Sequence, residues 1–116
     1  MPDNPYRWVV SFIVKKDLSV EFQKFMEETH FKTIHASECF TGVTRKVPQA
    51  DTKPGFDTIV YIHEPKSPEH WQAYCSGFRI NVAVPEFEGK YASALQNGDI
   101  SMIQTTGELT VLQMAA

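Results

Sequence analysis

The sequence lacks the features that mark membrane, disulfide-rich and nucleic-acid-binding proteins. It has no apolar run near the roughly 18 residues that a membrane-spanning helix needs. Its 116 residues include two cysteines, Cys39 and Cys75, without a CxxC spacing, so we expect reduced thiols and no disulfide framework. The 11 basic and 14 acidic residues give a formal net charge of −3 and no basic face, which argues against a nucleic-acid partner.

The first residues, MPDNPYRW, also lack the basic start and the apolar stretch of a signal peptide. With the reduced thiols, this predicts a cytoplasmic protein. We expect both cysteines to be buried as small hydrophobic residues, as free cysteines usually are. The length predicts one domain over 1–116, which should bury roughly two-thirds of the surface that its unfolded chain exposes.

Catalytic and cofactor motifs are missing as well. There is no GxSxG nucleophile motif, no phosphate-binding glycine loop and no paired-carboxylate pattern. His30 and His35 are separated by about 140° around a helix axis, so they do not converge on one ligand. A zinc-binding pair would need the i, i+4 spacing of HExxH. The sequence therefore predicts no metal site and no cofactor.

Short segments rich in aromatic and β-branched residues predict four strands. They are residues 6–14, 39–47, 56–63 and 100–114. The second and third strands should form a hairpin, because the loop between them, PQADTKPG, is turn chemistry. We expect a bulge in the fourth strand at Gly107.

The first helix is expected over about 19–36, with Ser19 as its N-cap. Its apolar stripe at helical spacing comprises Leu18, Phe22, Phe25, Met26, Thr29 and Thr33. Phe31 and Ile34 fall off this stripe. Either the helix kinks near His30, or it has a second buried side.

The second helix should begin at Ser67 as N-cap, with Pro68 in its first position. Its buried stripe comprises Trp71, Tyr74, Cys75 and Phe78. Pro85 should break this helix and start a further helical piece at about 86–96. Gly98 suits the position just after the end of that piece.

The order β-α-β-β-α-β predicts an α+β fold of the ferredoxin-like kind, a four-stranded antiparallel sheet with two helices on one face. However, the first and third strands are apolar on both sides. One side carries Val9, Ile13, Val60 and Ile62, and the other carries Trp8, Val10, Phe12, Ile59 and Tyr61. Helices on one face cannot bury both sets, so we expect two sheets to pack face to face in a homodimer.

These residues resemble the dimeric α/β-barrel superfamily. The shared features are the YRWVVSFIV strand, a helix with Phe25 and His30, and the CFTG entry to the second strand. The resemblance runs from about Tyr6 to Gly107 and is greatest to a small bacterial family of unknown function. More distant members are antibiotic-biosynthesis monooxygenases, polyketide cyclases and isomerases, many without cofactors. The resemblance implies a homodimer and a pocket between sheet and helices, but no particular reaction.

Several polar and aromatic side chains are candidates for a site. His30 matches the recurring histidine of that family and is either a core-edge imidazole bonded to a backbone carbonyl, or a general base or donor at a pocket mouth. Tyr61 and His63 share one face of a strand with Asp57, and they either line a ligand cavity or belong to the core and the strand end.

The second helix offers two further interpretations. Trp71, Tyr74 and Phe78 form an aromatic stripe that is typical of a core-facing helix, although Trp71 and Tyr74 would also shape a pocket. Arg79 either binds an anionic ligand or lies on the surface.

Two hypotheses for function follow. The first is a binding or accessory protein that holds a small apolar or aromatic molecule. The alternative is a cofactor-independent monooxygenase, cyclase or isomerase, with His30 as base and an aromatic or polyketide-like substrate. An enzyme predicts a cavity on which at least two polar side chains converge.

Overall fold

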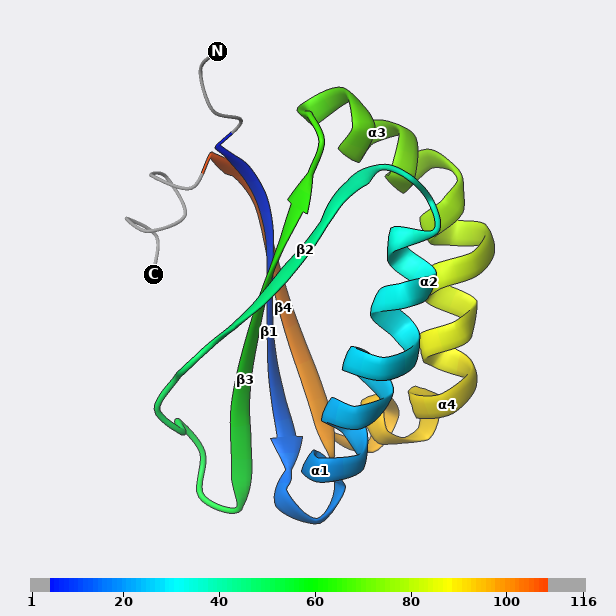
Figure 1. Cartoon of the computed structure of the whole chain (residues 1–116). Coiled ribbons are helices and arrows are strands. Elements are labelled where there is room, and N and C mark those ends of the chain that lie inside the picture. The colour runs from blue at the N-terminus through cyan, green and yellow to red at the C-terminus, as the bar shows by residue number, and fades with distance from the viewer. Residues whose placement is uncertain (1–4, 109–116) are drawn as a thin grey trace.

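The computed structural model describes residues 5–108, and the elements follow the expected order (Figure 1). The strands are β1 (Tyr6–Lys15), β2 (Phe40–Val47), β3 (Phe56–Pro65) and β4 (Ile100–Glu108). The helices are α1 (Lys16–Phe25), α2 (Phe31–His35), α3 (Pro68–Ser76) and α4 (Val84–Asn97). The ferredoxin-like α+β prediction is therefore confirmed.

The four strands form one antiparallel sheet in the order β2-β3-β1-β4. All the helices cover the same face of this sheet (Figure 1). The apolar strand β1 lies between β3 and β4, with Trp8 paired to His63 on one side and to Thr106 on the other. The two central strands thus have neighbours on both sides, while β2 and β4 form the edges.

The first helical segment begins earlier than expected. α1 starts at Lys16, and Lys15 occupies the N-cap position without a side-chain cap. The prediction of Ser19 as N-cap is wrong. Ser19 instead lies inside the helix, 1% exposed, and its hydroxyl accepts a hydrogen bond from the Gln23 side chain at 3.1 Å.

A π-helical turn over Met26–His30 joins α1 to α2 and resolves the broken stripe of this helix. Because a π-turn spaces its hydrogen bonds by five residues, each residue advances less around the axis than in an α-helix. The π-turn consequently keeps Phe22, His30 and Ile34 on one buried face of the helical segment. Thr29, expected on that face, is exposed. The irregularity expected near His30 is a π-turn.

The second helical segment follows its sequence signals more closely. The Ser67 side chain accepts from the His70 amide, with Pro68 in the first turn. α3 ends at Ser76, and a π-helical turn over Arg79–Ala83 leads into α4, which starts slightly before the expected piece. Gly98 ends α4 with φ +84°, as predicted.

The strand irregularity lies in a different strand from the one expected. β4 pairs with β1 without a register shift from Ile100 to Glu108, so the bulge predicted at Gly107 is wrong. The shift occurs in β2 between Phe40 and Thr44, where Gly42 has φ +92°. The expected extension of the fourth strand over 109–114 lies outside the described residues.

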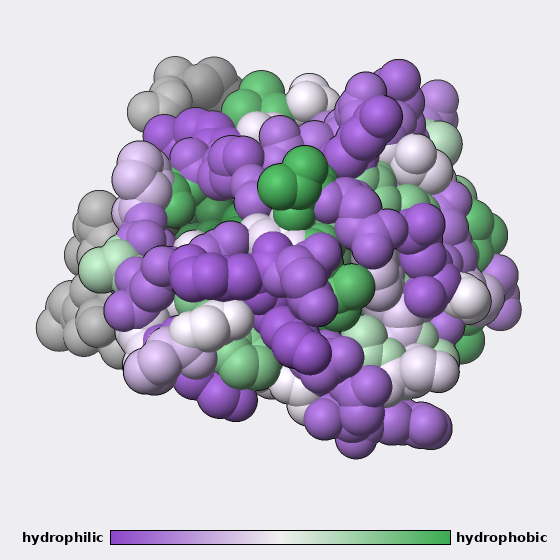
Figure 2. All heavy atoms as spheres, turned by 90° about the horizontal axis from the view of Figure 1, so that it is seen from below, coloured by the Kyte–Doolittle hydropathy of each residue, from purple (hydrophilic) through white to green (hydrophobic). Residues whose placement is uncertain are grey.

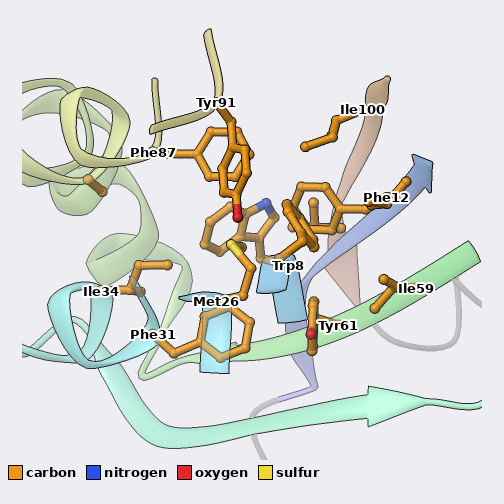
Figure 3. Close-up of a cluster of buried hydrophobic side chains, with 14 of the residues drawn as sticks. Trp8, Phe12, Met26, Phe31, Ile34, Ile59, Tyr61, Phe87, Tyr91 and Ile100 are labelled. Carbon is orange, nitrogen blue, oxygen red and sulfur yellow. The ribbon is translucent and has the colours of Figure 1, made fainter. Parts of the chain in front are cut away.

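The inner face of the sheet and the helices enclose an aromatic core (Figure 3). Side chains of the strands, such as Trp8 and Phe12, face Met26, Phe31 and Phe87 of the helices. Cys39 and Cys75 are unpaired and pack against this core. Each is only partly buried, so the prediction of full burial is wrong for both.

The outer face of the sheet has no helix over it (Figure 1). Its apolar side chains, by strand alternation and register, include Val9, Ile13, Val60, Ile62 and Ile103. Ile103 is 67% exposed. The two apolar sets expected from the sequence thus lie on opposite faces, and the helices bury one of them.

The end of the molecule where β1 enters α1 has a different character. Figure 2 shows mainly hydrophilic residues there, with hydrophobic ones in separate spots. Lys16 pairs with Asp57 at 2.7 Å and with Asp51 at 3.5 Å at this end. The ion pair with Lys16 thus engages the carboxylate of Asp57, which the sequence placed on the same face as Tyr61 and His63.

Candidate functional site

A cavity of about 110 Å³ lies between the inner face of the sheet and the helices. Aromatic and aliphatic side chains form most of its wall, among them Trp8, Val10, Phe12, Met26, Ile34 and Phe87. The exposed lining residues Val84, Glu88, Met102 and Gln104 belong to α4 and β4. The cavity therefore opens at the edge of the sheet, between α4 and β4.

His30 lines this cavity and is held by a carboxylate from the other helical segment. Its Nδ1 lies 2.7 Å from Oε1 of Glu86, and the Thr33 hydroxyl donates to Oε2 of Glu86 at 2.8 Å. Because a carboxylate only accepts, Nδ1 of His30 carries the proton, and the lone pair of a neutral ring lies on Nε2. One sequence interpretation expected a backbone carbonyl as the partner of His30, but the partner is the side-chain carboxylate of Glu86.

His63 is a second imidazole in the cavity wall. Thr44 Oγ1 lies 3.1 Å from Nδ1 of His63 and 3.0 Å from Nε2 of His35. The threonine hydroxyl carries one hydrogen, so it donates to one ring and accepts from the other. The His63 ring also stacks on Trp8, with ring centroids 4.5 Å apart. These contacts fix its orientation and leave Nε2 as its remaining polar atom.

Burial keeps both imidazoles in the cavity wall neutral. Burial lowers the pKa of His30, and the hydrogen bond to Glu86 opposes this effect. Burial also lowers the pKa of His63, to about 3, with a further contribution from the nearby His35 and His30. Near neutral pH the cavity therefore holds two uncharged rings, and the Nε2 of His30 is a hydrogen-bond acceptor.

Arg79 lines the cavity from the π-helical turn between α3 and α4. Its Nη2 donates to Oε1 of Gln104 at 2.8 Å, and its Nη1 lies 3.6 Å from Sγ of Cys75. The guanidinium carbon is 5.7 Å from the ring centroid of Trp8 and 5.6 Å from that of Trp71. Stacking on aromatic rings suits a guanidinium because it is planar and weakly hydrated.

The structure brings together four of the six site residues considered from the sequence. His30, His63, Tyr74 and Arg79 line the cavity. Trp71 is buried behind it, with its ring centroid 4.9 Å from that of Trp8.

The remaining candidate, Tyr61, lies on the β2 side of the sheet. Its hydroxyl donates to Oε2 of Glu27 at 2.8 Å, and Lys46 binds the same oxygen at 3.0 Å. Burial and this contact with Glu27 raise the pKa of Tyr61. The ring of Tyr61 is buried, and its hydroxyl reaches the exposed carboxylate of Glu27 at the surface, away from this cavity.

Sequence reasoning missed Glu86, Thr44 and Gln104. Glu86 is 56 residues from His30 in the chain, and only the packing of α4 against the first helical segment brings the two together. Its position just after Pro85 indicated a helix start and nothing more. Gln104 lies on an edge strand whose polar residues resemble ordinary surface positions.

Residues 5–108 contain neither a metal-binding cluster nor a membrane-spanning helix. No group of three or more histidine, cysteine, aspartate or glutamate side chains is placed to hold a metal ion in this part of the chain. Within the same residues, none of the helices has the length and apolar character to cross a membrane.

Comparison with known proteins supports the fold alone. No family model and no curated protein matches the sequence. A solved structure, described as a dimeric ferredoxin-like protein from an uncultured marine organism, is similar with a TM-score of 0.56. The two sequences are 10% identical, and the match covers 89% of this chain and 92% of that one.

Proposed function

We propose that the protein is a homodimer that binds a small aromatic or apolar molecule in the cavity between its sheet and helices. The observation that carries this proposal is an apolar, aromatic-lined cavity on which His30, His63 and Arg79 converge. Ligand sites typically combine apolar walls with a few placed polar groups. A volume of about 110 Å³ favours a single ring, since an engineered apolar cavity of about 150 Å³ holds benzene.

The dimer is supported by the outer face of the sheet. A contiguous apolar sheet face in water favours association, and closed two-fold symmetry is the commonest solution. The similar solved protein is itself described as dimeric. We further propose a cytoplasmic location, since Cys39 and Cys75 are unpaired.

A thermal-shift screen with single-ring probes tests the binding proposal. Toluene, p-cresol, benzamide and benzoate should include at least one that raises Tm by several degrees at concentrations about tenfold above its Kd. Ala83, which is buried in the cavity wall, offers a blocking variant. Ala83→Leu should fill the cavity and abolish the shift.

The exposed Ala92 on α4 provides the matched control. Ala92→Leu adds the same atoms outside the cavity and should keep the full shift. The proposal fails if no probe shifts Tm in the wild type. It also fails if Ala83→Leu, still folded by circular dichroism, responds as strongly as Ala92→Leu.

A second candidate function is cofactor-independent proton transfer, favoured by the Glu86–His30 pair. A carboxylate on Nδ1 orients an imidazole so that Nε2 acts as a general base, as in hydrolytic triads. His63 would then be the second polar group near the reacting atoms. This arrangement suits the removal of a proton next to a carbonyl, the step shared by many isomerases and cyclases.

Hydrogen–deuterium exchange tests this candidate. In deuterated water the wild type should accelerate exchange at the α C–H of a bound aryl ketone such as acetophenone. Glu86→Gln should reduce that acceleration by about 100-fold, within the usual range for general bases, while leaving ketone binding intact. Equal exchange in the two proteins, or no acceleration by the wild type, would exclude the candidate.

A further inference from the structure

The rim of the cavity presents more hydrogen-bond donors than acceptors. A guanidinium has five N–H groups and no acceptor. Arg79 uses one of them on Gln104 and one on the sulfur of Cys75. Its other N–H groups have no acceptor among the described residues. An arginine on a cavity rim with donors left over is able to bind a further group.

Gln104 adds donors beside Arg79. Its Oε1 accepts from Nε1 of Trp8 at 2.9 Å and from Arg79 at 2.8 Å. Because both partners are donors only, the amide orientation is fixed, with its NH₂ group left over. Within residues 5–108 this NH₂ group has no acceptor.

Tyr74 contributes a hydroxyl to the same region. Its side chain is 1% exposed and lines the cavity. Burial raises the pKa of Tyr74, and the positive charge of Arg79 works against that rise. A tyrosine hydroxyl in a cavity wall is able to donate a hydrogen bond to an occupant of the cavity.

The charge at the rim is also uncompensated. Arg79 forms no ion pair with any carboxylate of residues 5–108. Glu88 is the carboxylate among the lining residues, and it is exposed to solvent on α4. The guanidinium is instead half-buried over the rings of Trp8 and Trp71, where a charge is screened less than in water.

We propose that the ligand of this cavity is a carboxylic acid whose apolar, single-ring body enters the cavity while its carboxylate binds Arg79. The planar guanidinium matches a carboxylate, and the Gln104 amide and the Tyr74 hydroxyl donate to the same group. This inference rests on the proposed binding function and names its ligand class. It also explains why an apolar cavity ends in a cluster of unpaired donors.

Benzoate and benzamide form a matched probe pair, equal in shape and different in charge. Isothermal titration of the wild type should give a Kd at least tenfold lower for benzoate. Arg79→Gln, which keeps a polar side chain without the charge, should remove this difference and leave the Kd for benzamide within about twofold. Arg79→Lys, which keeps the charge but lacks the planar fork, should retain part of the preference.

Arg45→Gln serves as the charge control, because Arg45 is exposed on β2 and away from the cavity. It should keep the full preference for benzoate. Equal binding of the two probes by the wild type would overturn the inference and leave the proposed function standing. Weakening of both probes to the same extent in Arg79→Gln would also overturn it. Binding of neither probe would also overturn the inference. The proposed binding function would then be decided by toluene and p-cresol, the two probes of the screen that carry neither a carboxylate nor an amide.

Discussion

His63 is an imidazole that burial among aromatic rings holds neutral. It is 2% exposed and enclosed by the rings of Trp8, Phe31 and Phe40. Its pKa is about 3 in the folded protein, against an ordinary value near 6.5. Between these two values the unfolded chain binds a proton that the folded chain does not, so stability is lost as the pH falls.

This linkage predicts an acid-sensitive fold. Between pH 7.5 and 5.5 the free energy of unfolding should fall by about 1.4 kcal/mol on account of His63 alone. Urea unfolding at a series of pH values measures the decline. In His63→Gln the decline should be smaller by this amount, whereas His70→Gln, a change at an exposed histidine, should leave it unchanged. A decline of the same size in His63→Gln would contradict the assignment.

At the scale of single residues, the sequence predicted the candidate site only in part. His30 was singled out because it borders an apolar stripe, and it lines the cavity. The group that orients it, Glu86, has no local pattern to mark it. The spacing of residues along the chain predicts neighbours within one helix or strand. It does not predict contacts between distant segments, because these depend on how the elements pack.

At the scale of elements, the caps at Ser67 and Gly98 were predictable, whereas the start of α1 and the π-turns were not. Ser67 and Gly98 act as the sequence indicated, because capping depends on local backbone geometry. The π-turn at Met26–His30 has no comparable composition. It brings His30 onto the buried face in place of Thr29, and therefore decides which side chain enters the cavity.

Two glycines of the α4 region should respond in opposite ways to the same substitution. Gly98 has φ +84°, so Gly98→Ala should destabilise the protein by about 1 kcal/mol. Gly89 lies inside α4, and an added Cβ would contact nothing there, so Gly89→Ala should stabilise by about 0.5–1 kcal/mol. Urea midpoints of the two variants measure the effects. Destabilisation by Gly89→Ala as well would contradict the open surroundings of Gly89 inside α4.

At the scale of the whole molecule, the fold was readable from the order of the elements and the two-sided pattern of the strands. Val9 and Ile62 lie opposite each other on the face that no helix covers. Alternation along a strand is a rigid geometric rule, and for this reason the sequence predicted which residues share a face. The cavity on the other face depends on how helices and sheet pack in detail, which alternation does not determine.

The proposed dimer makes a prediction about mass. Sedimentation at micromolar concentration should give twice the subunit mass of 13.2 kDa. Ile62→Lys, a charge in the outer sheet face, should shift the protein toward the single-subunit mass. Val20→Lys changes a side chain that is 81% exposed on α1 and should leave the dimer intact. A wild type that is folded and sediments at 13.2 kDa would rule out the dimer.

We propose that the inner face of the sheet binds the ligand and that the outer face forms the dimer. NMR mapping of a bound single-ring probe tests this assignment most directly. Saturation with benzoate, or with the strongest probe of the thermal screen, should shift amide resonances around the cavity, at His30, His63 and Ala83. Resonances on the outer face, such as those of Val9 and Ile62, should stay in place. Shifts confined to the outer face, or spread evenly over the molecule, would contradict the cavity as the binding site.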